Sequence, residues 1–149
     1  MKIELDINPD NKERKIIIKS DEMTKDIEEI LKYISNIEEG NDRSIVGQKN
    51  EKIVIIKKDE IVRIYSLNKK VIAETLRESY EIKFRLYEIE DLLNQKDFIR
   101  ISKSEIINLK KVKCFDVSLM GSIEVEFVNG NKTYVSRRYV KILKEKVGI

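Results

Sequence analysis

Histidine is absent from this 149-residue chain, and cysteine occurs once, at Cys114. Without an imidazole, neither a Ser-His-Asp nor a Cys-His arrangement can form, because no side chain could act as the base. A single cysteine excludes an intrachain disulfide and a cysteine-rich structural zinc site. We therefore expect a protein that is not an enzyme and that needs no cofactor.

Long apolar runs are also absent. No segment approaches the roughly 20 apolar residues that span a bilayer, and the first ten residues alternate in charge instead of forming the apolar region of a signal peptide. A cytoplasmic protein is expected. With 38% charged and 41% apolar residues, one proline and five glycines, the composition indicates an ordered globular chain. The length allows one domain, or a small domain with an appendage.

Charge is distributed unevenly along the sequence. Residues 1–50 hold 9 Lys and Arg against 12 Asp and Glu, a net charge of −3, whereas residues 51–149 hold 21 against 15, a net charge of +6. An acidic front and a basic back suggest that the second part faces a polyanion. A lysine-rich solvated surface would give the same distribution, so charge alone does not decide between the two.

The sequence of residues 1–47 predicts a small ββα unit at the N-terminus. Residues 2–7 and 15–19 have the pattern of strands, and Ser20 or Asp21 can cap the helix that follows. The apolar positions of that helix are Met23, Ile27, Ile30, Leu31, Ile34 and Ile37. A unit this small rarely supplies its own core, so we expect the apolar stripe to pack on the rest of the chain or to form a dimer contact with a second copy.

Polar residues at 41–44 and 47–50 mark a boundary, after which 48–149 predict a second domain made mostly of short strands. The expected strands are 53–56, 61–65, 71–76, 80–84, 112–117, 123–127 and 133–135, and the expected helices are 86–93 and a final one capped by Ser136. Asn129-Gly130 predicts a type I′ hairpin turn. The fold class is mainly β with short helices, α+β overall.

Two arginines stand directly after the cap of the last helix. Arg137 and Arg138 in its first turn oppose the helix dipole, at a cost of roughly 0.3 to 1 kcal/mol each when exposed. A bound phosphate would offset that cost, because the arginines, the helix amides and the Ser136 hydroxyl would all attract it. Pairing of the arginines with Glu145 or another carboxylate would offset it equally well.

Two further segments carry positive charge between apolar positions. Lys69 and Lys70 lie in a predicted turn, where they could project into a groove or form an ordinary solvated hairpin tip. The other segment, 98–108, interrupts an apolar ladder with a polar island that could be a surface patch on a rigid frame or a salt-bridged loop. The island consists of Arg100, Ser102, Lys103 and Ser104.

Three phrases give the chain a family resemblance. They are YEIEDLLNQKDFIRISKSEIIN at 87–108, VEFVNG at 125–130 and YVSRRYV at 134–140. In this order and spacing they resemble the LytTR DNA-binding domain of bacterial transcription regulators, over about residues 52–149. The resemblance implies a mainly β multi-sheet fold whose loops, not a recognition helix, enter successive major grooves of double-stranded DNA.

The resemblance also implies roles for particular residues. The positions that read bases fall on Lys69, Lys103 and Arg138, where Lys or Arg would contact guanine O6 and N7. Side chains that would hold phosphates fall at Lys70, Arg100, Ser102, Ser104, Ser136 and Arg137. Many members have histidine at the position of Ser102, and some have histidine or asparagine at those of Lys69 and Lys103, so the operator sequence does not transfer.

Most members of that family carry an N-terminal receiver domain. Only about 50 residues precede the LytTR-like region here, too few for a receiver, so the chain resembles the receiver-free members, some of which are encoded beside a membrane-protein partner. We therefore expect a sequence-specific transcription regulator that binds two half-sites as a homodimer and has no small-molecule substrate. The alternative is a protein-interaction module on the same β scaffold that does not recognise DNA sequence.

Overall fold

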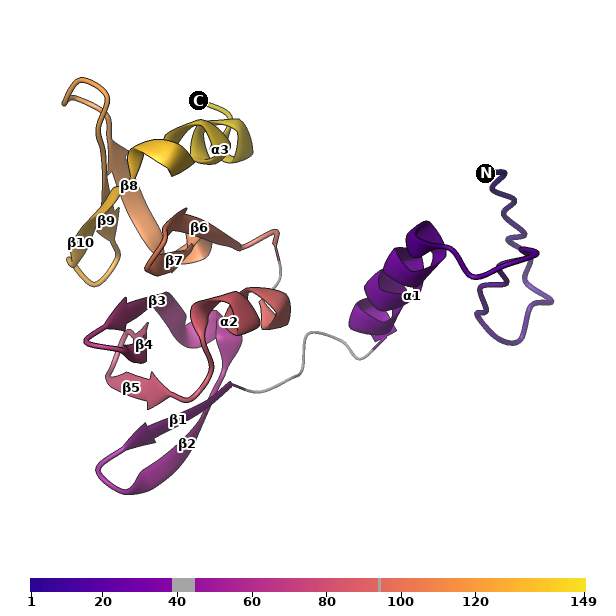
Figure 1. Ribbon diagram of the computed structural model, residues 1–149, viewed down its shortest axis with the longest axis horizontal. Helices are drawn as coiled ribbons and strands as arrows, with labels where there is room; N and C mark the ends of the chain where they lie inside the picture. The colour runs from indigo at the N-terminus through magenta and orange to yellow at the C-terminus, as the bar shows by residue number, and fades with distance from the viewer. Residues whose placement is uncertain (39–44, 94) are drawn as a thin grey trace. The chain divides into compact units, whose positions relative to one another are not determined.

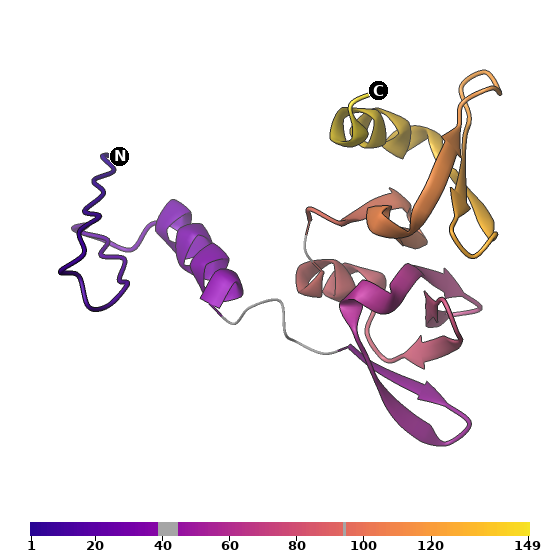
Figure 2. The same ribbon diagram turned by 180° about the vertical axis from the view of Figure 1, so that it is seen from behind.

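The computed structural model describes residues 1–38, 45–93 and 95–149, and the chain divides into two compact units, 1–38 and 39–149. The expected boundary loop at 41–44 lies outside the described residues. Among those described, no helix is both long and apolar enough to cross a membrane. Figures 1 and 2 show the two units from opposite sides.

The first unit contains helix α1 (Lys25–Glu38), which confirms the expected helix but not its start. The carbonyl of Thr24 accepts the amide of Glu28 at 3.0 Å, so the helix begins there and neither Ser20 nor Asp21 caps it. The two expected strands are also not formed in residues 1–24. A strand needs a partner and a buried face, and these residues have neither: the expected inner side chains of the first strand are exposed by 81 to 91%.

The second unit is built on a seven-stranded antiparallel sheet with the order β2-β1-β5-β4-β3-β7-β6. Its strands are β1 (Ile45–Lys49), β2 (Lys52–Ile56), β3 (Ile61–Leu67), β4 (Lys70–Thr75), β5 (Ser79–Ile82), β6 (Phe98–Ser102) and β7 (Glu105–Asn108). Helix α2 (Leu86–Leu92) packs on it. A second sheet, β8 (Val112–Asp116), β9 (Ile123–Phe127) and β10 (Lys132–Val135), leads into helix α3 (Arg137–Val147).

Strand β1 occupies residues that the sequence indicated as a boundary loop, and it extends across the expected division between 47 and 48. Gly47 explains the misleading pattern. It is buried, and a Cβ at this position would lie 2.6 Å from the Cβ of Tyr80. The glycine therefore serves close packing inside a sheet and does not mark a turn.

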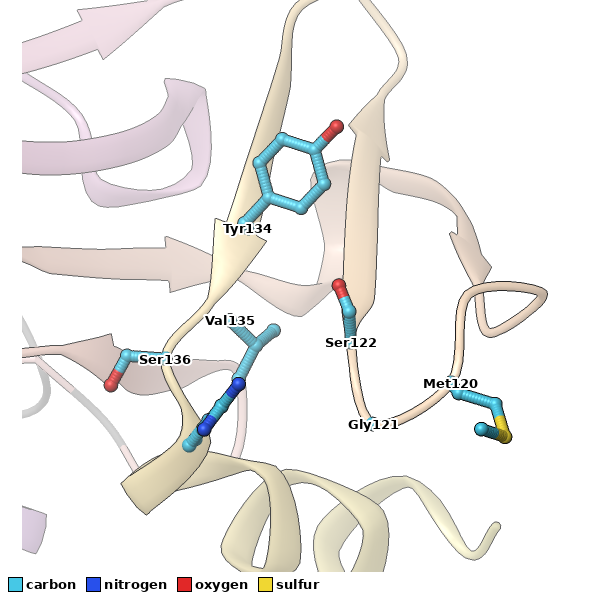
Figure 3. A pocket seen from close by; sticks show the side chains of 7 residues that line it. Met120, Gly121, Ser122, Tyr134, Val135 and Ser136 are labelled. Atoms are coloured by element: carbon cyan, nitrogen blue, oxygen red, sulfur yellow. The ribbon is translucent and has the colours of Figure 1, made fainter.

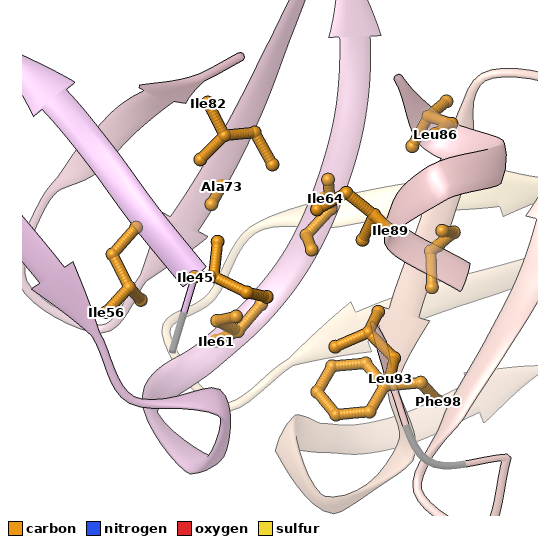
Figure 4. Close-up of a cluster of buried hydrophobic side chains, with 11 residues drawn as sticks. Ile45, Ile56, Ile61, Ile64, Ala73, Ile82, Leu86, Ile89, Leu93 and Phe98 are labelled. Atoms are coloured by element: carbon orange, nitrogen blue, oxygen red, sulfur yellow. The ribbon is translucent and has the colours of Figure 1, made fainter. Parts of the chain in front are cut away.

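The segment 98–108 is a hairpin, β6–β7, with an apolar core on each of its faces. Phe98 and Ile106 belong to the cluster between α2 and the large sheet, shown in Figure 4. Ile99, Ile101 and Ile107 belong to a second cluster, with β9, β10 and α3. Figures 1 and 2 show the hairpin between these two layers. This explains the apolar ladder, because both faces of the hairpin are buried.

A buried ionic network joins the two sheets. Arg63 on β3 donates to Glu74 at 3.2 Å and to Glu105 at 2.9 Å. From the second sheet, Asn129 donates to Glu74 at 3.3 Å and Thr133 to Glu105 at 2.6 Å. Although burial opposes its charge, the bonds to the two glutamates raise the pKa of Arg63, so it stays charged.

The turn at Asn129-Gly130 is not the expected type I′ turn. Only Gly130 of that pair has a positive φ, +86°, and its amide donates to the Phe127 carbonyl at 2.9 Å. This is a type I turn followed by a left-handed glycine. Two-residue turns with both φ values positive instead join β1 to β2 at 50–51 and β3 to β4 at 68–69.

Candidate nucleic-acid interface

Three short segments carry the side chains expected to touch DNA, and two backbone hydrogen bonds hold them together. The amide of Ser66, near the end of β3, donates to the Ser104 carbonyl at 2.8 Å. The amide of Ser136, before α3, donates to the Ile101 carbonyl at 2.9 Å. The turn between β6 and β7 is therefore central, with the β3–β4 turn on one side and the start of α3 on the other.

The β3–β4 turn consists of Asn68 and Lys69, with φ values of +51° and +64°. A non-glycine residue in the left-handed region costs roughly 1 to 2 kcal/mol, which asparagine tolerates better than lysine. Lys69 is exposed and has no ion pair among the described residues. Its neighbour Lys70 is also exposed, and its ammonium lies 3.6 Å from the carboxylate of Glu81.

The β6–β7 turn carries Lys103 at its tip, exposed and without an ion pair in the described parts of the chain. The backbone amide of Ser104 donates to the Ser102 hydroxyl at 3.1 Å, and the two hydroxyls lie 3.3 Å apart. These bonds fix the turn from within and leave the lysine side chain outside it.

Arg100, expected to hold a phosphate, lies beneath this turn. Its Nε donates to the Ser102 carbonyl at 2.9 Å, its Nη1 to Glu90 of α2 at 3.0 Å, and its Nη2 to the Lys103 carbonyl. The side chain is 22% exposed. The residue types in the sequence give no signal for this arrangement, because two of the three acceptors are backbone carbonyls.

Helix α3 begins after Ser136, as expected, but the Ser136 hydroxyl makes no capping bond. Arg137 and Arg138 are exposed, and within the described residues neither has an ion pair, with Glu145 or any other carboxylate. The positive end of the helix dipole therefore faces two arginines without a compensating anion from those residues. This is the arrangement in which an external phosphate would be stabilised.

A pocket of about 460 Å³ lies beside the start of α3, and no pattern in the sequence predicts it. Its lining residues are Met120, Gly121, Ser122, Tyr134, Val135, Ser136 and Arg137. Figure 3 shows Met120 and Gly121 across the pocket from Ser136. The loop between β8 and β9 is thus a neighbour of the expected phosphate-binding residues.

Taken together, the side chains expected to contact DNA at these three segments are cationic or hydroxylic. No group of three or more His, Cys, Asp or Glu side chains among the described residues could hold a metal ion. Cationic and hydroxyl donors on neighbouring turns can bind phosphate oxygens and the acceptor edges of bases.

Comparison with known families agrees with this chemistry. A model of the LytTr DNA-binding domain matches residues 51–148, about two thirds of the chain. The chain belongs to the LytTR family. Its fold also resembles a solved LytTr DNA-binding domain from Bacillus cereus, with a TM-score of 0.69 and 20% identity, over 71% of this chain and 97% of that one.

The similarity to curated proteins covers the N-terminal unit as well. Two uncharacterized HTH-type transcriptional regulators of Staphylococcus aureus, from strains NCTC 8325 / PS 47 and COL, are each 34% identical to this chain over 149 residues. These alignments span 100% of this chain and 99% of each relative. No helix-turn-helix occurs in the described residues here, because strands separate α1, α2 and α3 from one another.

Proposed function

We propose that this LytTR protein is a sequence-specific transcription regulator that reads double-stranded DNA with its turns. The observation that carries the proposal is the convergence of three exposed cations without ion pairs in the described residues, held in place by two backbone hydrogen bonds. The cations are Lys69, Lys103 and Arg138. A protein acting on chromosomal DNA in a bacterium works in the cytoplasm.

In this proposal Lys69, Lys103 and Arg138 contact base edges in the major groove, where lysine and arginine pair with guanine O6 and N7. Contacts to phosphates are assigned to Lys70, Ser102, Ser104, Ser136 and Arg137. Arg100 holds the β6–β7 turn in position, since its guanidinium already donates to the carbonyls of the turn.

The regulator acts as a homodimer on two half-sites, which would raise affinity by making the second contact intramolecular. A membrane protein is the proposed source of its signal. This assignment rests on the resemblance to receiver-free members of the family.

The test is fluorescence anisotropy with DNA from the regulator's own promoter and with a scrambled duplex. Lys103→Ala and Arg138→Ala should each lose about 1 to 3 kcal/mol of discrimination between the two. Arg137→Ala should weaken binding to both duplexes equally. Lys12→Ala, which removes the same charge from the N-terminal unit, is the matched control and should change neither.

Equal affinity of the wild-type chain for both duplexes would reject the proposal. That result, with the salt dependence of a generic basic protein, is what a protein-interaction module on this scaffold would give. A partner recovered specifically by the wild-type chain would then support that alternative.

A further inference from the structure

The outer edge of the large sheet has an exposed apolar surface. Strand β2 is its last strand, and among the described residues β1 alone pairs with it. Ile53 and Ile55 on β2 are 77% and 69% exposed. Val46 on β1, which pairs with Ile55, is 44% exposed. These three side chains share one face. An apolar edge strand of this kind is a template for pairing with another strand.

The hairpin geometry identifies which backbone groups of β2 are unpaired. Lys49 and Lys52 close a two-residue turn, and such closing pairs exchange hydrogen bonds. Bonding alternates along the strand, so Lys52, Val54 and Ile56 bond to β1. The amides and carbonyls of Ile53 and Ile55 therefore point away from the sheet.

We propose that a second copy of this chain pairs with β2, antiparallel, about a two-fold axis at Val54. A two-fold axis makes the same patch meet itself, and an antiparallel strand pair satisfies it. Ile53 of each copy then lies opposite Ile55 of the other, and their outward backbone groups bond directly. The exposed isoleucines of both copies and the two Val46 side chains form one continuous apolar strip.

Charge selects this register over its neighbours. With the axis at Val54, Glu51, in the turn just before β2, lies nearest to Lys57, just after β2 of the other copy. With the axis at Ile53, Glu51 would face Ile55, and with the axis at Ile55, Lys57 would face Ile53. Neither Glu51 nor Lys57 has an ion pair in the residues that the structure describes. Exposed pairs contribute little energy, so they specify the register while the apolar strip supplies most of the stability.

The described residues of the apolar stripe on helix α1 are more buried than Ile53 and Ile55 of β2, although Leu31 is 43% exposed. Ile27 is only 8% exposed and Ile30 and Ile34 are half-buried, whereas both outward isoleucines of β2 are largely exposed. In strand order β2 is also at the opposite edge from β6, so pairing leaves the β6–β7 turn accessible. The inference deepens the proposed homodimer, but its test does not depend on DNA recognition.

Disulfide trapping reads the register directly. In a full-length Cys114→Ser background, Val54→Cys places two thiols at a directly opposed, non-hydrogen-bonded position, where the Cα atoms of a strand pair lie about 4.5 Å apart. Lys52→Cys is the matched control, since it lies on the same strand and is exposed, but it would face Ile56 of the other copy. Under mild oxidation, Val54→Cys should form a covalent dimer and Lys52→Cys should not. Crosslinking of both variants, or of neither, would overturn the proposal.

Sedimentation equilibrium of the chain without added cysteines gives an independent measure. Ile55→Lys should raise the dimer dissociation constant at least tenfold while leaving the thermal midpoint nearly unchanged when both chains are compared at a concentration at which they are monomeric. Ile30→Glu should leave the dimer intact; loss of the dimer with Ile30→Glu and its survival with Ile55→Lys would place the contact on α1 instead. A monomeric wild-type chain at all concentrations would also reject the β2 contact. Because none of these measurements uses DNA, a failure here leaves the base-reading proposal standing.

Discussion

The Nε of Arg100 donates to the carbonyl oxygen of Ser102 over 2.9 Å. A second nitrogen of the same guanidinium bonds to the Lys103 carbonyl, and a third bonds to Glu90 on α2. One side chain thus connects the turn that presents Lys103 to a helix packed in the core. A lysine that reads bases, as proposed for Lys103, must be held in a fixed position, and these bonds from Arg100 would provide that rigidity.

Arg100→Ala should therefore reduce sequence discrimination without removing a phosphate contact. We expect the ratio of affinities for promoter and scrambled duplexes to fall at least tenfold, because the turn loses its clamp. The slope of log K against log salt should stay unchanged. Arg137→Ala is the contrasting variant, and its slope should become shallower by about 0.9, the value for one phosphate.

Glu90→Gln tests the positioning role of Arg100 separately from a phosphate contact. It keeps an acceptor for Arg100 but loses the charge, and should give a smaller loss of discrimination than Arg100→Ala. A shallower salt slope in Arg100→Ala would show instead that its guanidinium turns outward to a phosphate in the complex.

The sequence predicted the second unit well where each strand has its own apolar pattern. The strands from 53–56 to 133–135 and the helix after Ser136 all appear in the structure near their expected positions. The alternating pattern at 2–7 wrongly predicted a strand. Alternation gives a segment one apolar face, but a strand also needs a neighbouring strand to pair with and a surface to cover that face. Alternation also missed β1, where Gly47 and the polar residues after it have the composition of a loop.

The sequence indicated the candidate site as a set of residues but not as an arrangement. Unexplained positive charge marked the three segments one by one, and the resemblance to the LytTR domain singled out Lys69, Lys103 and Arg138 within them. Their convergence depends on strand order and on the Ser66 to Ser104 and Ile101 to Ser136 bonds, which no local pattern encodes. The role of Arg100 was equally hidden, since a guanidinium that faces backbone carbonyls has the same sequence signal as one that faces solvent.

Arg63 should be essential for stability even though arginine is normally a surface residue. Arg63→Met would leave Glu74 and Glu105 as buried carboxylates without their cation, and we expect a loss of about 3 to 5 kcal/mol in the free energy of unfolding. Urea denaturation measures this. Lys70→Met removes an exposed partner of Glu81 and should change stability by less than about 1 kcal/mol. Equal effects of the two variants would refute a structural role for the network.

Cys114 should react slowly with alkylating agents despite its exposed position. Desolvation by its neighbours and the bond from its Sγ to Glu126, at 3.5 Å, raise the pKa of the thiol. The thiolate is the reactive form, so a raised pKa lowers the alkylation rate at every pH below the raised pKa. The same shift contributes stability that is complete at low pH and is lost as the pH rises through the folded-state pKa.

Glu126→Gln should accelerate that reaction. Removing the carboxylate lowers the pKa of the Cys114 thiol, and iodoacetamide rates at pH 7 to 9 should rise several-fold. Glu124→Gln, on the same strand but bonded to Tyr134 at 2.8 Å, is the control and should leave the rate unchanged. An equal acceleration in both variants would point to loosening of β9 and not to the thiol's pKa.

Lys69 should lower the stability of the fold while contributing to DNA binding, because it occupies a left-handed position with a φ of +64°. Lys69→Gly relieves the steric cost of about 1 to 2 kcal/mol, against the roughly 0.5 to 1 kcal/mol that glycine adds in unfolded-state entropy. We therefore expect the free energy of unfolding to stay equal or rise by up to about 1.5 kcal/mol, while promoter affinity falls. Asn68→Gly relieves the adjacent left-handed residue but keeps the lysine, so its promoter affinity should be retained. If Asn68→Gly weakens binding as much as Lys69→Gly, the turn's rigidity and not the ammonium group is what the DNA requires.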